Sequence, residues 1–383
     1  EEAPMNPRLF PLLFTALLAL GGVSSARTGP ASTPGEVSPS RGVTRPPQRT
    51  ASRSTSARAG LSAGDAAVPG TPLLEGADPH VAVFGNRYWL YMTTGDSANP
   101  TIGTFHAYSS TDFKQWKKSP AILDLKTIEW VRKGAPVNLG WAPAIARGDD
   151  GKYYFYYSLG PQDERNKLYS RIGVAVGDGP GKPFTDLGKL LPLEEDNSFE
   201  AIDPMVFKDP RSGNWYLYAG GSAGDHMECF ELAPGLDRLG RRLAVPRIIN
   251  APRGSSFTEG PFVHFHKGTY YLSYSHGGWN RSNYSAHYAT GPSATGPWTY
   301  GGQILRSKGL RKGPGHHSFF RHPKTKNWYI VYHYWYDRLG DGPFGGARSI
   351  GIERVRHKNR RITLTDIEND DLPPPLTGRS AAR

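Results

Sequence analysis

Tyr88-Trp89-Leu90-Tyr91 is the first of five aromatic-rich stretches that share one pattern. The other four read YYFYY at 153–157, WYLY at 215–218, YYLSY at 270–274 and WYIVY at 328–332, so their first residues lie 65, 62, 55 and 58 positions apart. Each stretch follows a short strand-like segment and a turn. A repeat of this period with aromatic strands and turn signals is typical of propeller blades. The sequence therefore predicts an all-β, five-bladed β-propeller, with a two-sheet sandwich as the alternative.

The first strand of each predicted blade starts at a distinctive residue, and three of the five are acids. In order, the residues are Asp78, Trp141, Asp203, Glu259 and His316. Because the first strand of every blade lines the central channel, three carboxyl groups should surround one axis. A proline follows each acid within two residues and favours extended backbone before it, which we expect to aim the side chain inward. Buried acids are costly unless they are paired or used, so the repetition predicts a functional site.

The charge of the chain indicates which partners to expect. The 383 residues carry a net charge of +12, mostly from arginines between residues 27 and 58 and from a basic run between residues 354 and 361. These cations are scattered over a tail and one strand pair, which argues against a nucleic-acid partner and favours attraction to an acidic polysaccharide. The single cysteine, Cys229, excludes an intrachain disulfide and a cysteine-based metal site.

The ends of the sequence differ in composition from the part that repeats. After a short N-terminal extension, a basic start at residues 5–8, an apolar run at 9–20 and small residues at 23–26 indicate a secretory signal. We therefore expect an extension and signal peptide at 1–26, a disordered Ser/Pro/Arg-rich linker at 27–70, the propeller at 71–375 and a disordered tail at 376–383. The apolar run is too short to span a membrane, so the expected location is extracellular, with no membrane partner.

Three carboxyl groups around one axis suit the hydrolysis of a glycosidic bond. One carboxyl protonates the leaving oxygen and another activates water. A third negative charge beside the acid raises its pKa and keeps it protonated near neutral pH. An Asp/Asp/Glu set therefore gives each member a role.

At these residues the sequence resembles glycoside hydrolase family 43, whose five-bladed propellers attack arabinose- and xylose-containing plant polysaccharides. The resemblance covers about residues 72–355. It implies that Asp78 is the general base, Glu259 the general acid and Asp203 the residue that tunes and orients the acid, in an inverting reaction with base and acid roughly 6.5–9.5 Å apart. The matching motifs are Ala77-Asp78-Pro79, Trp141-Ala142-Pro143, Ile202-Asp203-Pro204, Glu259-Gly260-Pro261 and Gly313-Pro314-Gly315-His316.

The resemblance also suggests residues around the acids. His316 occupies the place of an axial histidine that holds a water or a calcium ion; the alternative is a structural histidine bonded to backbone. Calcium prefers oxygen ligands, so a single histidine would need several waters beside it. Arg348 resembles an arginine that contacts sugar hydroxyls and the acid, although a solvated strand arginine would look the same. Trp141 and, more weakly, Trp279 are candidate stacking platforms, and His317 is a further candidate that could face either way. No cofactor is expected beyond that structural calcium.

The expected substrate is an arabinose side chain of arabinoxylan or arabinan in the plant cell wall. We expect no second β-sandwich domain after the propeller. Because such a domain often closes the pocket of β-xylosidases in the family, α-L-arabinofuranosidase is favoured. β-Xylosidase, endo-arabinanase and exo-galactanase remain alternatives, because loops set the depth of the pocket. Alternatives of other classes are an inactive carbohydrate-binding propeller and a protein-interaction platform. Overlapping glycosylation sequons begin at Asn280 and Asn283 and fit a secreted chain.

Overall fold

The computed structural model describes most of the repeating part of the chain. The described residues are 73–95, 102–134, 139–160, 170–191, 198–221, 226–245, 247–366 and 372–376. The predicted signal peptide and linker lie outside them, as does the predicted tail apart from its first residue, Leu376. That residue is buried, and its N–H bonds the carbonyl oxygen of Thr111.

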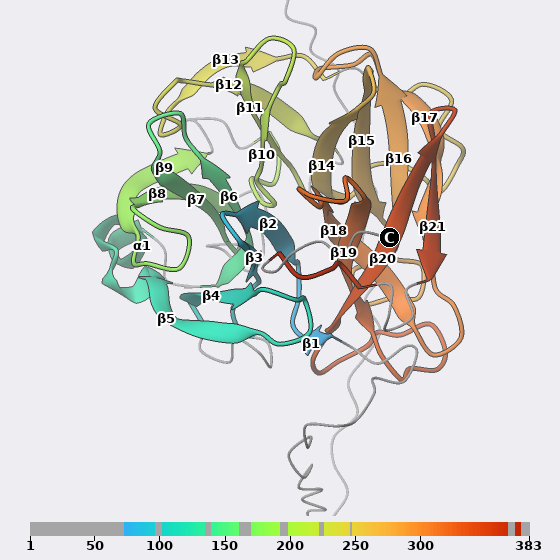
Figure 1. The fold of residues 1–383 in the computed structure, drawn as a ribbon, viewed down its shortest axis with the longest axis horizontal. Helices are drawn as coiled ribbons and strands as arrows, with labels where there is room; N and C mark the ends of the chain where they lie inside the picture. Colours follow the sequence, from blue (N-terminus) through green and yellow to red (C-terminus); the bar gives the residue numbers. More distant parts are fainter. Residues whose placement is uncertain are drawn as a thin grey trace, which may run out of the picture. The chain divides into compact units, whose positions relative to one another are not determined.

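Five antiparallel sheets form five blades, which confirms the predicted β-propeller. In Figure 1 the first strand of each sheet lies near the middle and the last lies at the rim. Blade one consists of β2 (His80–Phe84), β3 (Arg87–Tyr91), β4 (Thr104–Ser110) and β5 (Lys117–Asp124), and blade two of β6 (Gly140–Arg147), β7 (Tyr153–Leu159), β8 (Arg171–Gly177) and β9 (Thr185–Leu191). Blade three consists of β10 (Met205–Lys208), β11 (Trp215–Ala219), β12 (Glu228–Leu232) and β13 (Leu239–Leu243), and blade four of β14 (Glu259–His266), β15 (Thr269–His276), β16 (Ser285–Gly291) and β17 (Thr299–Leu305). Blade five consists of β18 (Lys312–Arg321), β19 (Trp328–Trp335), β20 (Ser349–Lys358) and β21 (Arg361–Asp366).

The ring closes at blade five. The first strands contact one another in the cyclic order β2, β6, β10, β14, β18 and back to β2. Strand β1 (Leu74–Glu75), which precedes blade one in the sequence, pairs with β20 of blade five. The two ends of the repeat region are thereby joined in one sheet, which fixes the first strands around a common axis.

The aromatic second strands explain why the repeat is so visible in the sequence. Neighbouring blades cover both faces of each second strand. Nearly all residues of these strands are therefore buried, instead of alternating between buried and exposed. The buried tyrosines find polar partners in the next blade: Tyr91 donates to Pro180 O at 2.7 Å, Tyr156 to Leu236 O at 2.7 Å and Tyr218 to Ala294 O at 2.6 Å. These bonds tie blades one to four to one another in order, while the rings fill the space between them.

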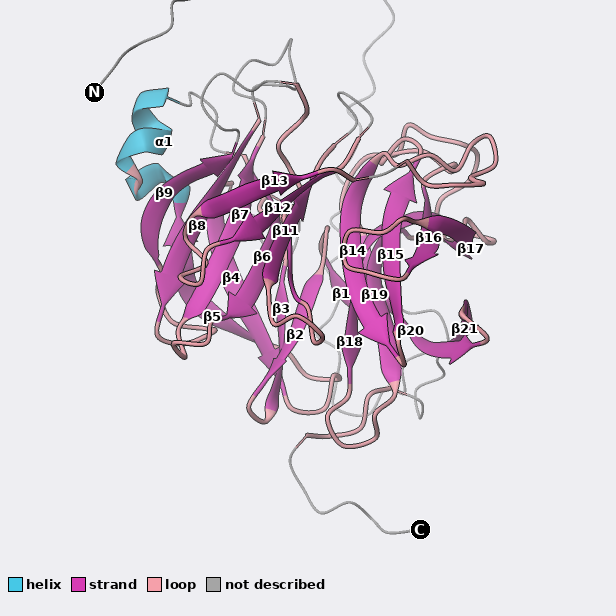
Figure 2. Cartoon of the chain, turned by 90° about the horizontal axis from the view of Figure 1, so that it is seen from above, coloured by secondary structure: helices cyan, strands magenta, loops and turns pink. Residues whose placement is uncertain are grey.

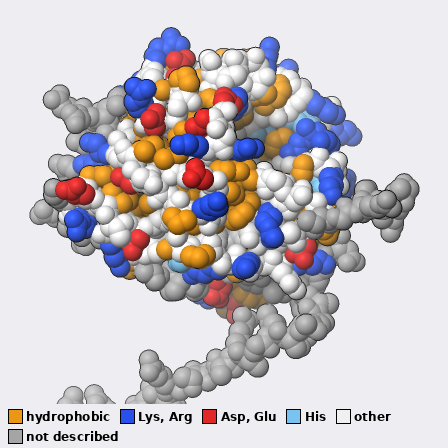
Figure 3. All heavy atoms as spheres, turned by 60° about the vertical axis from the view of Figure 1, so that its left-hand side comes forward, with side chains coloured by type: hydrophobic (Ala, Val, Ile, Leu, Met, Phe, Trp, Pro, Cys, Tyr) orange, Lys and Arg blue, Asp and Glu red, His pale blue; other side chains and the backbone are white. Residues whose placement is uncertain are grey.

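Helices are short and peripheral, as the sequence predicts. In the part of the chain that the structure describes, they are a 3-10 turn at Leu125–Thr127 and α1 at Glu129–Gly134, which lies beside β9 at the rim (Figure 2). Among the described residues, no helix has the length and apolar character needed to cross a bilayer. On the face shown in Figure 3, Lys and Arg side chains are interspersed with Asp and Glu.

Each first strand is entered through a residue in the left-handed region, which we call the bulge residue, and not through the extended backbone expected before the prolines. The register of β6, β14 and β18 shifts at this point, whereas Asp78 and Asp203 lie just before β2 and β10. One residue at each entry has a positive φ: 52° at Asp78, 35° at Ala142, 58° at Asp203, 63° at Gly260 and 37° at His316. For residues other than glycine this conformation costs about 1–2 kcal/mol each. Such strain is typical of functional sites, and bulges re-aim side chains there.

The bulges also correct the predicted equivalence of the three acids. Asp78 and Asp203 occupy the same bulge position in blades one and three. In blade four that position belongs to Gly260, and Glu259 lies one residue earlier, opposite Ser275 on the neighbouring strand. Glu259 is therefore the equivalent of Trp141, which lies opposite Ser158 in blade two.

Candidate active site

A chain of hydrogen bonds links the bulges of adjacent blades. In four cases a side chain near the end of one blade's second strand binds the N–H of the next blade's bulge residue. Thr93 Oγ1 accepts from Ala142 N at 2.8 Å, Ser158 Oγ from Asp203 N at 2.9 Å, Ser275 Oγ from His316 N at 2.8 Å and His333 Nδ1 from Asp78 N at 3.2 Å. The bonds hold the strained entries in place, and with them the side chains that face the axis.

Blade three breaks this pattern, and the exception positions an acid. The place of the polar residue is taken by Gly220, whose N–H bonds Ile202 O, and a Cβ there would lie 2.5 Å from His226 O. Without a side chain from this strand, the N–H of Gly260 is bound instead by Asp203 Oδ2 at 3.0 Å. The Asp203 carboxyl is therefore fixed next to Glu259 by a bond that threonine, serine or histidine makes elsewhere in the ring.

Asp78 lies in a positively charged and strongly hydrogen-bonded environment. Its Oδ1 is 3.2 Å from Arg348 Nη1, 3.1 Å from His333 Nδ1 and 3.5 Å from His316 Nδ1, and its Oδ2 accepts from Thr93 Oγ1 at 2.5 Å. Burial alone would raise the pKa of Asp78, but Arg348, with the two imidazoles, holds it well below its usual range. Asp78 is therefore a carboxylate at neutral pH.

Asp203 has the opposite charge environment. Burial and the negative charges of Glu259, Asp78 and Glu200 raise the pKa of Asp203 well above its usual value, and only the bond from Gly260 N–H acts against this. Asp203 and Glu259 therefore act as one titrating pair that keeps a proton at pH values where Asp78 has lost its own.

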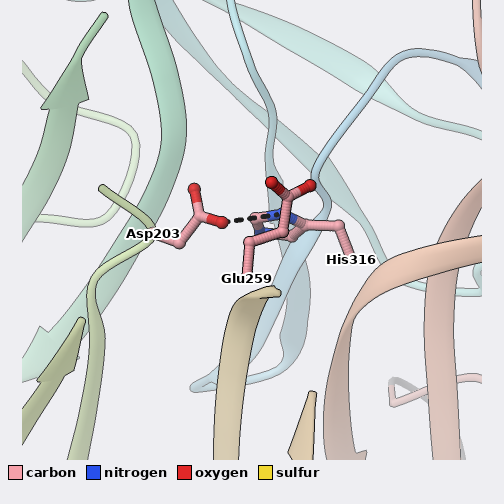
Figure 4. A group of neighbouring side chains, drawn as sticks. All are labelled: Asp203, Glu259 and His316. Carbon is pink, nitrogen blue, oxygen red and sulfur yellow. Dashed lines mark ion pairs between the residues drawn. The ribbon is translucent and has the colours of Figure 1, made fainter. Parts of the chain in front are cut away.

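Glu259 and His316 complete the cluster. One carboxyl oxygen of Asp203, one of Glu259 and one ring nitrogen of His316 all lie within 4.8 Å of one another. Figure 4 shows the Asp203 carboxyl directed at the His316 ring, with Glu259 beside it, and the Asp203 Oδ2 to His316 Nδ1 distance is 3.5 Å. Since His316 Nδ1 also lies 3.5 Å from Asp78 Oδ1, one imidazole lies against both aspartates, with Glu259 within 4.8 Å of it. Burial lowers the pKa of His316 to about 4, so the ring is neutral at neutral pH.

The donors around His316 do not match the needs of a calcium ion. Calcium takes about six to eight oxygen ligands. The cluster supplies two carboxyl groups and one nitrogen, and Asp203 Oδ2 already accepts a hydrogen bond from Gly260. The raised pKa of Asp203 further means that a cation would have to displace a proton there.

A small cavity lies on the axis against Asp78 and Asp203, and His317, the residue after His316, also lines it. Asp78, Asp203 and His316 line it together with prolines from four blades and His317. His317 is buried, its Nε2 lies 2.7 Å from Ser273 Oγ, and burial lowers its pKa to about 3. The sequence left its direction open; the structure turns it into the channel wall.

The two candidate tryptophans lie in different surroundings. Trp279 is 46% exposed, and its ring centroid is 5.3 Å from the guanidinium carbon of Arg348, the residue that binds Asp78. An open aromatic face is thus held beside the acid cluster. Trp141 is half-buried, and its ring packs against Gly160, where a Cβ would lie 2.8 Å from the indole.

Sequence reasoning missed the residues that hold the acids. Thr93, Ser158, Ser275 and His333 each lie one or two residues after the last aromatic of a repeated stretch, and Tyr284 donates to Glu259 Oε1 at 2.6 Å. The first four share a visible signal, because a polar residue at that point in four of five copies interrupts an otherwise apolar strand. Tyr284 carries no such signal, since it lies in a loop outside the repeated stretches.

Chemically, this arrangement brings an ionised carboxylate and a proton-holding carboxyl pair to one channel mouth. Such a pair of sites can accept a proton from water and deliver one to a leaving group. Aromatic faces beside them can stack on the apolar face of a sugar ring.

Comparison with known proteins agrees with this chemistry. The sequence model of Glycosyl hydrolases family 43 matches residues 70–360. A β-D-galactofuranosidase, xynD, of Aspergillus niger is 32% identical over 69% of this chain and 76% of its own length, and a xylosidase/arabinosidase of Bacteroides ovatus is 28% identical over 67% and 85%. A crystal structure of a thermostable family-43 glycoside hydrolase, 25% identical, superposes with a TM-score of 0.63 over 79% of this chain and 96% of that one. Fold, acid cluster and family match together lead to one conclusion: the chain belongs to glycoside hydrolase family 43.

Proposed function

We propose that this chain is a secreted, inverting glycosidase that removes α-L-arabinofuranosyl residues from arabinoxylan or arabinan of the plant cell wall. One observation carries the proposal. Asp78 is held as a carboxylate, whereas the Asp203–Glu259 pair keeps a proton, and both lie against His316. An enzyme that hydrolyses a glycosidic bond in one displacement needs an ionised carboxyl group as base and a protonated carboxyl group as acid at the same time.

In the proposed reaction, water attacks the anomeric carbon while Asp78 accepts its proton. Glu259 gives its proton to the glycosidic oxygen, and the bond between that oxygen and the anomeric carbon breaks. Asp203 and Glu259 share one proton near neutral pH, because burial and the charge of its neighbour disfavour ionisation of Asp203, and Arg348 keeps Asp78 ionised between turnovers. Water and sugar must both fit between the acid and the base, so we expect a separation of roughly 6.5–9.5 Å in the substrate complex.

The substrate itself is inferred from the relatives and the aromatic surfaces. A relative named xylosidase/arabinosidase supports a pentose, and Trp279 with Trp141 offers two faces for stacking. The relative named β-D-galactofuranosidase favours a second candidate, a galactofuranoside. β-Xylosidase, endo-arabinanase and exo-galactanase activities remain alternatives on this scaffold.

Product analysis on a panel of arabinan, arabinoxylan, xylo-oligosaccharides, galactan and a β-D-galactofuranoside separates these candidates. Free arabinose as the sole product supports the proposal. Xylose, arabinobiose, galactose or galactofuranose release would each overturn the substrate assignment. NMR of the first-formed anomer tests inversion, and Glu259→Gln separates an enzyme from a binding module, because a binding module would show no turnover to lose.

A further inference from the structure

One buried pair of aromatic rings touches both candidate catalytic carboxyls and has no role in the mechanism above. His333 lies on β19 of blade five, and Tyr284 directly precedes β16 of blade four. Their rings are stacked, with centroids 5.7 Å apart and planes 5° apart, and both side chains are fully buried. The pair therefore bridges two blades directly behind the acids.

His333 holds the candidate base at two points. Its Nδ1 lies 3.1 Å from Asp78 Oδ1 and 3.2 Å from the backbone N of Asp78. Burial lowers the pKa of His333, so the ring is neutral at neutral pH. Because the same nitrogen faces both groups, a neutral ring either accepts from the Asp78 N–H or donates to Asp78 Oδ1, and either bond holds Asp78 in place.

Tyr284 holds the candidate acid. Its Oη donates to Glu259 Oε1 at 2.6 Å, and burial together with the charge of Glu259 raises the pKa of Tyr284 well above its usual value. The hydroxyl therefore keeps its proton and remains a donor. Because the carbonyl oxygen of a protonated carboxyl is a better acceptor than its hydroxyl oxygen, the bond to Oε1 favours placing the transferable proton of Glu259 on Oε2.

The glycines of the Gly313-Pro314-Gly315-His316 motif make room for this pair. A Cβ on Gly315 would lie 2.2 Å from Cε1 of Tyr284, closer than atoms can approach. Gly315 is also the residue opposite His333 in the β18–β19 ladder. The motif thus brings the chain close enough to the tyrosine ring for the stack to form.

We infer that His333 and Tyr284 are positioning residues that act as one stacked unit: His333 fixes Asp78, and Tyr284 fixes Glu259 with its transferable proton on Oε2. This inference rests on the proposed function. It assigns the two rings to different steps, since one acts through the base and the other through the acid. That difference can be measured with substrates that differ only in the leaving group.

Tyr284→Phe removes the hydroxyl and keeps the stacked ring. Cleavage of an arabino-oligosaccharide needs a well-placed proton, whereas cleavage of 4-nitrophenyl α-L-arabinofuranoside needs little protonation of its leaving group. We expect kcat/KM to fall about tenfold on the oligosaccharide and less than about twofold on the aryl glycoside. An equal fall on both substrates would overturn the role assigned to Tyr284.

His333→Asn removes the ring from the base. Water attack is common to both substrates, so we expect equal falls of about tenfold. The acidic limb of the kcat/KM profile should also move to higher pH, because His333 is one of the groups that hold the pKa of Asp78 down. Unequal falls or an unmoved limb would contradict the role assigned to His333. If thermal melting shows that this variant does not fold, the substrate ratio of Tyr284→Phe decides.

Tyr274→Phe is a matched control. Tyr274 is a buried tyrosine of the same blade that stacks on His287, with centroids 6.0 Å apart, and donates to Ser255 O at 2.7 Å. Its loss should leave the substrate ratio unchanged. If the wild type is active but Tyr284→Phe and Tyr274→Phe show the same ratio of kcat/KM on the oligosaccharide to kcat/KM on the aryl glycoside, this inference alone is overturned. A wild type that cleaves neither substrate overturns the proposed function as well.

Discussion

Asp78 and Asp203 occupy equivalent positions in blades one and three, yet they carry opposite charge states. Both precede a proline, both are buried, and their φ angles are 52° and 58°. The pKa of Asp78 is held well below its usual range, whereas that of Asp203 is raised well above it. The repeat sets where each carboxyl lies, and the neighbouring blades set whether it is ionised.

The difference comes from what blades four and five present to each carboxyl. Asp78 faces Arg348 of the last blade, and Asp203 faces Glu259. His316 contacts both acids, but its own pKa of about 4 means that it carries no charge above that pH. Arg348 is therefore the permanent positive charge beside Asp78 at neutral pH, and the asymmetry of the site depends chiefly on that one guanidinium.

Asp78→Asn should have the largest effect. The amide cannot accept the proton of water, so kcat/KM should fall about 10³–10⁴-fold on aryl and natural glycosides alike. The measurement is steady-state kinetics on both substrate types, with the circular dichroism spectrum as a check on folding. Activity within tenfold of wild type would mean that another group is the base and that the low pKa of Asp78 serves the fold.

Asp203→Asn should have a smaller effect on catalysis than Asp78→Asn and should raise the stability of the protein at neutral pH. The amide oxygen still accepts from Gly260 N–H, but the negative charge beside Glu259 is gone. We expect kcat to fall about 10²-fold, and more steeply toward high pH, because the pair no longer retains its proton there. Kinetics between pH 4 and 8 test this, and an unchanged profile would remove Asp203 from the proposed mechanism.

The stability effect of Asp203→Asn follows from the sign of its pKa shift. Since the folded chain binds this proton more tightly than the unfolded chain does, the stabilisation is present below the unfolded pKa and is lost as pH rises through the folded pKa. At neutral pH the folded wild type still binds a proton that the unfolded chain has released, which lowers its stability, and the amide removes this cost. Melting temperatures at pH 4 and 7 should show the variant gaining about 2–4 °C relative to wild type only at pH 7. A loss at both pH values would argue that Asp203 is structural.

Arg348→Gln should make Asp78 behave more like Asp203. Without the guanidinium the pKa of Asp78 rises, so the acidic limb of kcat/KM moves to higher pH and activity at low pH falls about tenfold. Activity should be partly regained as the pH rises. Arg338→Gln is the control, because Arg338 is a half-buried arginine that bonds Gly345 O. If both variants shift the limb equally, general surface charge rather than the Arg348 contact is responsible.

The propeller and its acids could be predicted from the sequence because their signals repeat. Five aromatic strands at a nearly constant period predict five blades, and an acid near the start of a blade's first strand predicts a side chain at the channel. Asp78, Asp203, Glu259, His316 and Arg348 do lie together. A local pattern is enough for this, because the symmetry of the ring converts equal positions in the sequence into proximity.

The charge states of the acids and the backbone geometry at the strand entries could not be predicted from the sequence repeat. They depend on contacts between blades, such as Arg348 with Asp78, which are 270 residues apart in the chain. The rule that proline favours extended backbone before it failed at Asp78 and Asp203, because the bonds from their N–H groups to His333 and Ser158 hold a bulge there. The repeat was also misaligned by one residue at Glu259, since the bulge is invisible in the sequence.

The smallest effect tests whether the hydrogen bonds between blades carry that bulge. Ser158→Ala leaves the N–H of Asp203 buried and without its acceptor, which should lower the free energy of unfolding by about 1–3 kcal/mol. Thr363→Ala, on the exposed side of β21, should change it by less than about 0.5 kcal/mol. Denaturant melts of both variants give the two values.

Because the carboxyl of Asp203 is held separately by Gly260 N–H, kcat should change far less in Ser158→Ala than in Asp203→Asn. A loss of activity as large as that of Asp203→Asn, without a loss of stability, would show instead that Ser158 acts in the site, and that the bulge needs no support from the neighbouring blade.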